Sequence, residues 1–161
     1  MALAVAAGGG VVVHAITTSP GRAERAGYRI NDCVDIAPSA DGLLHASKTS
    51  CNTDPSFEVS AYADAAGHCR PDRFDRFGPP RADPDTGTLC LEPNLLAGHC
   101  YRFGDPVGMW KSADCGAAGP AVIKVTKRVD VDDDTACSTG AGELAMAYPA
   151  PPRTYCTAPA R

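Results

Sequence analysis

Two stretches of the chain alternate apolar and charged residues in the same way. Phe57–Val59 reads Phe-Glu-Val and Ile123–Val125 reads Ile-Lys-Val, which is the two-residue period of a strand with one buried face. A segment rich in turn-forming residues precedes each of them, Pro38–Gly42 in the first case and Gly104–Gly108 in the second. Glycine supplies positive φ angles and proline presets φ, so both intervals predict strand, turn, strand. The pattern therefore predicts a mainly β fold, built mostly of antiparallel strands.

Eight cysteines divide the chain into two sets of four with matched spacings, 15 to 22 residues from one cysteine to the next within a set. The residues around the last cysteine of each set also agree, because Thr88–Pro93 and Thr154–Pro159 share Thr, Cys and Pro at the same offsets. We therefore predict an internal duplication, with residues 21–95 and 96–161 as two tandem, small, disulfide-stapled β-rich modules. Each module has room for a short helix between its third and fourth cysteines, and Arg70–Phe77 is the best candidate. The alternative is a single secreted domain with coincidentally even cysteines.

Composition gives the cysteines a structural role. Aromatic residues make up only 6% of the chain, so neither half can bury a large core, and small domains of this kind usually need staples. A disulfide that closes a loop of 15 to 20 residues stabilises by about 3 kcal/mol in the chain-entropy model. Eight cysteines allow 105 pairings, and three remain if the halves are equivalent and self-contained. We expect first-to-second and third-to-fourth pairing, because the intervening hairpins bring these cysteines together: Cys33–Cys51, Cys69–Cys90, Cys100–Cys115 and Cys137–Cys156.

Two metal-binding interpretations are weaker than the disulfide interpretation. The chain has no C-x-x-C pair, and no His lies three to five residues from another His, as expected of a zinc site. Two Ala-Gly-His-Cys segments, Ala66–Cys69 and Ala97–Cys100, fall at different places in the two cysteine sets, so we treat them as coincidence. Asp130–Asp134 resembles the start of an EF-hand loop, but Thr135 and Ala141 stand where that loop requires Gly and Glu. We therefore expect a solvated acidic turn, and no metal or other cofactor.

The candidate catalytic residues do not form a known pattern. His45, His68 and His99 follow the apolar N-terminus, but no G-x-S-x-G or H-E-x-x-H segment accompanies them. None of these histidines recurs at the same place in both halves, and cysteines of an even-numbered set are expected to be paired. We therefore predict that the protein is not an enzyme and has no catalytic residues. Trp110 is interpreted as a cover for the small core rather than as a binding anchor.

Residues 1–20 form an apolar segment that reads as a secretory signal or a membrane anchor. Val13–Ala15 fits the small-residue pattern of a cleavage site. Met1–Ile16 lacks the basic flank of a signal, and a start codon upstream of Met1 would explain that lack. Both interpretations expose the cysteines to an oxidising compartment. We expect an extracytoplasmic protein, secreted or anchored to the outer face of the cytoplasmic membrane.

Three short motifs of the first half resemble those of a known family. Tyr28–Val34 (YRINDCV), Cys51–Val59 (CNTDPSFEV) and Thr88–Leu91 (TLCL) are similar to the LppU-like small exported proteins of actinobacteria. Their pattern is approximately G-D-C-V, a cysteine followed by a Pro-containing turn and a Y-x-V strand, a third cysteine and a closing L-C-L. Asn31 replaces the usual Gly, and Leu96–Pro159 resembles the pattern more weakly. The resemblance implies an extracytoplasmic protein and brings no catalytic residues.

These features together predict an exported cell-envelope or secreted module that binds a protein or an envelope component, with membrane contact only through its N-terminal segment. The net charge of −4 and the absence of a basic stripe argue against binding to nucleic acid. The expected contact surfaces are the turns Pro38–Gly42 and Gly104–Trp110. A small secreted hydrolase, or an accessory subunit of one, is the alternative, and an extracellular protease inhibitor is a third. A hydrolase needs a pocket in which a histidine meets a carboxylate.

Overall fold

The computed structural model describes residues 27–69, 82–104, 109–117, 122–138 and 142–160. In these ranges the chain forms two antiparallel sheets and four disulfides, so the prediction of a mainly β fold is confirmed. No helix in the same ranges has the length and apolar character that a membrane span needs. The apolar segment 1–20 and the helix candidate Arg70–Phe77 lie outside the described residues.

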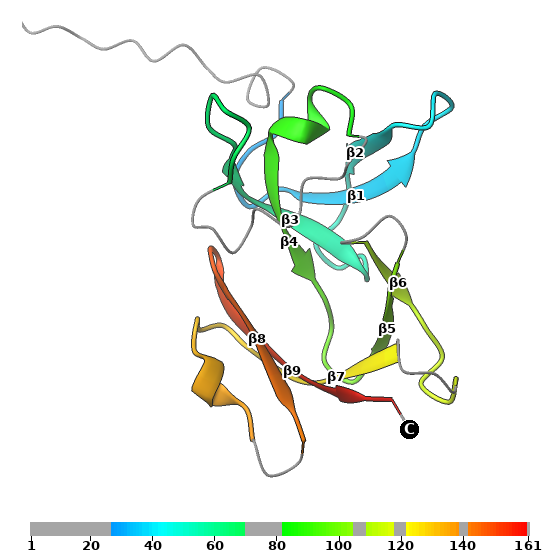
Figure 1. The fold of residues 1–161 in the computed structure, drawn as a ribbon, viewed down its shortest axis with the longest axis vertical. Coiled ribbons are helices and arrows are strands. Elements are labelled where there is room, and N and C mark those ends of the chain that lie inside the picture. Colours follow the sequence, from blue (N-terminus) through cyan, green and yellow to red (C-terminus); the bar gives the residue numbers. More distant parts are fainter. Residues whose placement is uncertain (1–26, 70–81, 105–108, 118–121, 139–141, 161) are drawn as a thin grey trace, which may run out of the picture.

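The first sheet has four strands in the order β2-β1-β3-β4 (Figure 1). The predicted turn Pro38–Gly42 connects the first two strands, and Gly42 has the positive φ (78°) that this turn requires. Alternation within the first strand places Val34 and Ile36 in the core and Asp35 at the surface. The elements of this part of the chain are β1 (Cys33–Pro38), β2 (Leu44–Lys48), β3 (Ser56–Tyr62), the 3-10 helix η2 (Thr86–Thr88) and β4 (Leu89–Asn94).

The second sheet has five strands in the order β6-β5-β7-β9-β8. Its elements are β5 (Cys100–Phe103), β6 (Trp110–Ser112), β7 (Val122–Val129), the 3-10 helix η3 (Asp134–Ala136), β8 (Leu144–Pro149) and β9 (Pro152–Pro159). The sequence left room for a short helix between Cys137 and Cys156, but the described part of this interval forms β8. This segment pairs along its whole length with β9, and the prolines at 149, 151 and 152 are incompatible with a helix interior.

Both sheets contain a bulge at the same place in their third strand in sequence order. The bulge lies at Ser60 in β3 and at Thr126 in β7. In each case the side-chain hydroxyl of the extra residue donates to a cysteine carbonyl on the next strand, Cys90 (2.8 Å) and Cys156 (3.0 Å) respectively. A bulge interrupts the ladder of backbone hydrogen bonds, and the hydroxyl supplies a donor at that point.

The turns that lead into β1 and β5 also share their backbone geometry. Asn31 has φ of 72° and Gly98 has φ of 87°. The amides of these residues donate to the carbonyls of Val59 and Val125, at 2.8 Å and 2.7 Å. Asn is one of the few residues other than Gly that adopt this left-handed conformation.

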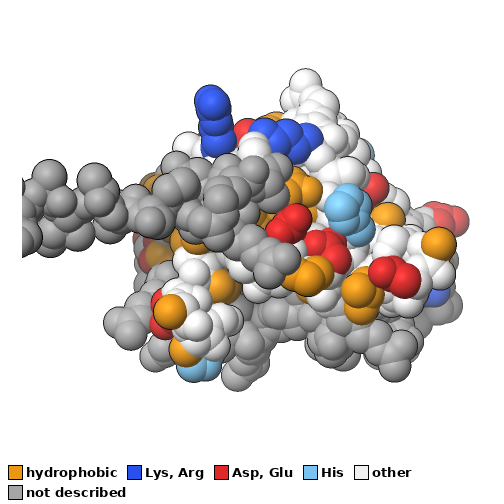
Figure 2. All heavy atoms as spheres, turned by 90° about the horizontal axis from the view of Figure 1, so that it is seen from above, with side chains coloured by type: hydrophobic (Ala, Val, Ile, Leu, Met, Phe, Trp, Pro, Cys, Tyr) orange, Lys and Arg blue, Asp and Glu red, His pale blue; other side chains and the backbone are white. Residues whose placement is uncertain are grey.

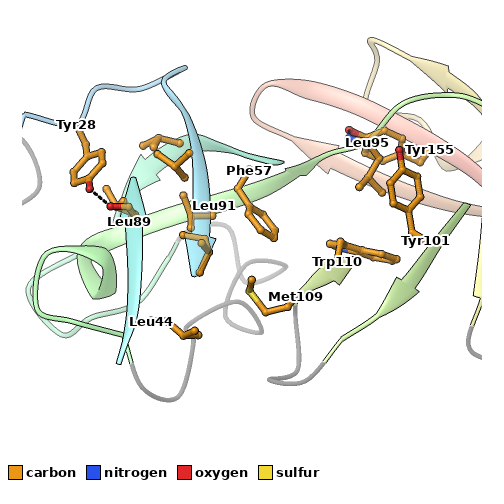
Figure 3. Packing of buried hydrophobic residues seen from close by; sticks show 14 of the residues in the cluster. Tyr28, Leu44, Phe57, Leu89, Leu91, Leu95, Tyr101, Met109, Trp110 and Tyr155 are labelled. Carbon is orange, nitrogen blue, oxygen red and sulfur yellow. Dashed lines mark hydrogen bonds between the residues drawn. The ribbon is translucent and has the colours of Figure 1, made fainter. Parts of the chain in front are cut away.

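A single hydrophobic cluster joins the two sheets (Figure 3). All six residues of β4 are buried, and the chain continues through the fully buried Leu95 into the second sheet. The core therefore combines side chains of both halves of the chain. Its larger members are Tyr28, Val34, Phe57, Leu91 and Leu95 from the first half, with Tyr101, Trp110 and Tyr155 from the second.

Tyr155 fixes the position of the second sheet relative to β4. Its hydroxyl donates to the carbonyl of Pro93 (2.8 Å) and accepts a hydrogen bond from the amide of Leu95 (3.1 Å). Both groups belong to buried backbone at the end of β4, which has no further strand beyond it in its own sheet. The tyrosine thus satisfies backbone groups that would otherwise be buried without partners.

Candidate functional site

All eight cysteines are paired in four disulfides, as predicted, and no cysteine is free. Their Cα–Cα distances of 5.1 to 5.6 Å lie in the ordinary range. Backbone hydrogen bonds close the hairpins beside two of them, from Thr49 N to Cys33 O and from Ala113 N to Cys100 O, both at 2.9 Å. The pairs are those favoured by the hairpin argument: Cys33–Cys51, Cys69–Cys90, Cys100–Cys115 and Cys137–Cys156.

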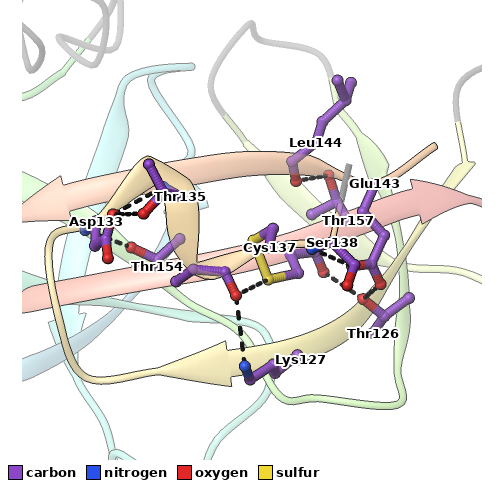
Figure 4. Close-up of a disulfide and its surroundings, with 12 residues drawn as sticks. Thr126, Lys127, Asp133, Thr135, Cys137, Ser138, Glu143, Leu144, Thr154 and Thr157 are labelled. Carbon is purple, nitrogen blue, oxygen red and sulfur yellow. Dashed lines mark hydrogen bonds between the residues drawn. A yellow bond between two sulfur atoms is a disulfide. The ribbon is translucent and has the colours of Figure 1, made fainter. Parts of the chain in front are cut away.

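The acidic segment before the last disulfide is a capped turn (Figure 4). Asp133 accepts hydrogen bonds from the amide (2.8 Å) and the hydroxyl (2.6 Å) of Thr135 and so caps the start of η3. These two hydrogen bonds lower the pKa of Asp133. Asp130 lies 3.5 Å from the guanidinium of Arg128. The carboxylates of Asp130 and Asp133 are thus engaged with the chain itself. In the part of the chain that the structure describes, no group of three His, Cys, Asp or Glu residues is arranged to hold a metal ion.

His45 is held by a carboxylate that also starts η2. Asp83 lies next to it because Asp83 N donates to Leu44 O (2.9 Å). His45 Nδ1 is 2.9 Å from Asp83 Oδ2, and the hydroxyl of Thr86 donates to the same oxygen at 2.6 Å. Burial alone would raise the pKa of Asp83, but hydrogen bonds from Thr86, from the amide of Asp85 and from His45 outweigh it and lower this pKa to about 2. The face of the molecule seen in Figure 2 shows a histidine beside acidic side chains at the surface.

His99 forms a second histidine–carboxylate pair, which connects the two halves of the chain. Its Nδ1 is 2.7 Å from Oδ2 of Asp54, which precedes β3. The other carboxylate oxygen of Asp54 accepts from the hydroxyl of Tyr101. Burial and this hydrogen bond raise the pKa of Tyr101. More than half of the His99 side chain is exposed, whereas Asp54 is nearly covered.

Each of the two pairs provides the imidazole and the orienting carboxylate of a hydrolase, but a hydrolase also needs a nucleophile. An aspartate that orients an imidazole is common to nucleophilic active sites, but the other ring nitrogen must then reach a hydroxyl or thiol. No Ser or Thr hydroxyl in the described ranges hydrogen-bonds to either imidazole, and all thiols are in disulfides. His68, the third candidate, lies 4.0 Å from Asp64 at the surface. The structure therefore places all three histidines near carboxylates, and His45 and His99 at hydrogen-bond distance, without completing a triad among the described residues.

Trp110 lies in the core and not at the surface. It is buried, and its ring makes edge-to-face contacts with Phe103 (centroids 4.9 Å apart) and Tyr101 (6.4 Å). Of the two turns expected to be contact surfaces, Pro38–Gly42 is exposed and braced by the Asp41 carboxylate, which accepts from Ser39 Oγ. Residues 105–108 of the other turn lie outside the described residues.

A pair of glutamates between the sheets, one fully buried and one partly buried, is not indicated by the sequence. Glu58 on β3 and Glu92 on β4 are directly opposite each other in the register. Arg153 of β9 reaches this pair, with its Nη2 2.8 Å from Glu58 Oε2. Glu92 has no exposed surface, and its Oε1 accepts from the amide of Ala150 (3.1 Å). Its Oε2 and the Nε of Arg153 have no hydrogen-bond partner among the described residues.

Burial raises the pKa of Glu92 to about 8, against the opposing effects of the Ala150 amide and of Arg153. The carboxyl is therefore neutral over most of the physiological pH range. Alternation along β3 and β4 assigns both glutamates to the solvent-facing side of the sheet. The tip of the β8–β9 hairpin covers that side, and no local pattern in the sequence indicates such a contact.

No family model, no curated protein and no solved structure matches the chain. Inferences about its function therefore rest on its own residues.

Proposed function

We propose that this protein is an exported module, secreted or attached to the cell envelope, that binds a protein or an envelope component and catalyses no reaction. The observation that carries the proposal is the pairing of all eight cysteines in disulfides. Four disulfides in a chain of 161 residues are compatible with an extracytoplasmic location. The resemblance to the LppU-like exported proteins supports the same location.

We further propose that the two halves are tandem copies of one module, with the boundary near residues 95 and 96. The bulge hydroxyls of Ser60 and Thr126 and the left-handed turns at Asn31 and Gly98 support this history. The order of pairing also supports it, because β2-β1-β3-β4 matches β6-β5-β7-β9 strand for strand. The second copy then carries one extra strand, β8.

Divergence between the halves favours binding over catalysis. His45 lies in a hairpin strand of the first half, whereas His99 lies in the turn before β5 of the second. The two histidine–carboxylate pairs are thus at unrelated positions, and neither is a duplicated active site. Conserved backbone with changed surface residues is what a scaffold that presents binding surfaces requires.

The proposal is tested by following the full chain in a bacterium that exports it. Thiol alkylation without reductant should leave all eight cysteines unmodified in the exported protein, and cross-linking in envelope extracts should capture a partner. Free thiols in the native protein, or retention of the protein in the cytoplasm, would contradict the proposed location. Failure to enrich any partner over a scrambled-disulfide control would contradict the binding function.

A hydrolase is the second candidate, and the short contact between His99 and Asp54 is the observation that favours it. Turnover of ester or peptide substrates that is lost in His99→Ala, and kept in His68→Ala, would establish it. Equal background rates for the two variants and the native protein are the result expected from the binding proposal.

A further inference from the structure

Four basic side chains from three strands lie on one face of the second sheet. Arg102 on β5 is directly opposite Lys111 on β6, so both point to the same side. Lys124 on β7 is opposite Cys100, which is two residues from Arg102 on the same strand and therefore shares its side. Lys127 is opposite Cys156 on β9, and the register of β7 with β9 places it on that side too.

This basic face, defined by Arg102, Lys111, Lys124 and Lys127, is the side of the sheet that faces away from the core. Tyr101, which lies on the other side of β5, is fully buried, whereas all four cations are exposed. Figure 4 shows Lys127 beside the Cys137–Cys156 disulfide. The Nζ of Lys127 is 3.5 Å from the backbone carbonyl of Ala136. From strand geometry, neighbouring cations of the face have Cα atoms about 5 to 10 Å apart.

The charges of the basic face are not neutralised within the described chain. None of the four cations takes part in a salt bridge with a described residue, although the protein has a net charge of −4. Arg102 and Lys111 form a directly opposed pair of like charges, an arrangement that costs folding stability. The carboxylate of Glu143 shares the hydroxyl proton of Thr126 with the carbonyl of Cys156 and accepts from the amide of Ser138, and it forms no ion pair with these cations. A local arrangement that lowers stability without an evident structural gain is typical of a functional surface.

The corresponding positions of the first sheet carry no cation. Asp35 and Ser47 form the cross-strand pair that matches Arg102 and Lys111, and Glu58 matches Lys124 because each is opposite the first cysteine of its half. If the halves are copies, the basic charges arose on one copy only. The same strand positions in the first sheet are acidic or neutral, and Glu58 is covered by the β8–β9 hairpin.

We infer that the basic face binds a linear acidic polysaccharide, an inference that rests on the proposed binding function and names its partner. A group of exposed cations on the outer side of a sheet complements repeated negative charges along a polymer. Single-stranded nucleic acids require aromatic stacking partners, and Phe103 and Trp110 lie on the other side of these strands. Stable attachment to a lipid surface takes a second element besides a basic patch, such as apolar side chains that insert, and the exposed Leu144 occupies a strand position of the other side.

The test compares two double variants of the full, disulfide-intact chain that have the same net charge. Arg102→Gln with Lys111→Gln removes half of the basic face, and Arg29→Gln with Lys48→Gln removes two exposed cations elsewhere. Binding to heparin is measured by titration at several salt concentrations, with neutral dextran as the blank. We expect the native protein to bind heparin at low salt and the Arg102/Lys111 variant to bind about tenfold more weakly or worse. Its log–log salt slope should fall by about one for each cation removed, whereas the Arg29/Lys48 variant should keep the native slope.

Five outcomes would overturn the inference. The first two are no heparin binding by the native protein at low salt, and equal weakening in both variants, which would show an effect of net charge alone. The third is tighter binding to oligo-dT or to phosphatidylserine vesicles than to heparin. The fourth is salt-sensitive self-association that the Arg102/Lys111 variant abolishes, which would assign the face to the acidic surface of a second copy. If that variant still captures its partner from envelope extracts as well as the native protein does, the basic face is excluded while the proposed binding function stands.

Discussion

Replacing Glu92 with Gln tests whether the fold holds a neutral carboxyl group between its sheets. The groups that face this carboxyl are Glu58 on β3, Arg153 on β9, Tyr148 on β8 and the amide of Ala150, with Asp132 contributing a weaker repulsion. An amide has the shape of a protonated carboxyl, and it keeps an oxygen that accepts from Ala150. The substitution should therefore be nearly neutral at pH 5.

The effect of the substitution grows with pH because the pKa of Glu92 is about 8 in the folded protein and ordinarily 4.5. Between these two values the folded state binds a proton that the unfolded state has released, so the stability of the native protein falls as pH rises. The slope is about 1.4 kcal/mol per pH unit, which amounts to about 3 to 4 kcal/mol between pH 5 and pH 8. The Gln variant lacks this loss. Relative to the native protein, it should become more stable by that amount over the same range.

Urea unfolding with intact disulfides, followed by the fluorescence of the single Trp110, measures this difference at pH 5, 6.5 and 8. Asp35→Asn is the matched control, because it makes the same carboxyl-to-amide change at an exposed position of β1. Its difference from the native protein should not vary with pH by more than about 0.5 kcal/mol, as for ordinary surface positions. If the Glu92→Gln difference were also independent of pH, Glu92 would be ionised in the folded protein and the argument from burial would be wrong.

Three further changes probe the staples, the junction of the sheets and the left-handed turns. Replacing Cys137 and Cys156 together with Ser opens a loop of 19 residues and should lower the free energy of unfolding by about 3 kcal/mol in urea titrations; a loss below 1 kcal/mol would contradict it. Tyr155→Phe leaves buried backbone groups of β4 unpaired and should cost about 1 to 3 kcal/mol without changing the circular dichroism spectrum. Asn31→Gly should raise, and Gly98→Asn should lower, the free energy of unfolding, each by less than about 1 kcal/mol, and the melting temperature should shift in the same direction. Equal effects of the same sign would argue against a shared turn geometry.

Local features of the sequence were sufficient to predict the hairpins. Gly42 and the residues around it encode the turn between β1 and β2 by their own backbone preferences. The hairpins then place Cys33 near Cys51 and Cys100 near Cys115, which is why the pairing could be inferred from spacing. The mainly β character follows from the same alternation of apolar and charged residues.

Features that depend on contacts between distant segments were not predictable in this way. β8 is a strand because β9 pairs with it, and its own apolar residues do not distinguish a strand from a buried helix. Glu58 sits in an alternating pattern that assigns it to solvent, yet Arg153, 95 residues later, covers it. The four cations of the basic face gather only through the register of three strands, so the linear sequence shows no basic stripe.

The burial of β4 has a consequence for the order in which the protein takes shape. During synthesis the Pro93 carbonyl of this strand precedes the tyrosine that binds it, Tyr155, by 62 residues. Until that tyrosine emerges, the six buried residues of β4 and the leucine that follows it have no second sheet to cover them. A fragment that stops after β4 would therefore expose a hydrophobic edge that other chains can pair with. The disulfides can form within each half before synthesis ends. The apolar residues of β4 are covered, and protected from aggregation, only after β9 has been synthesised.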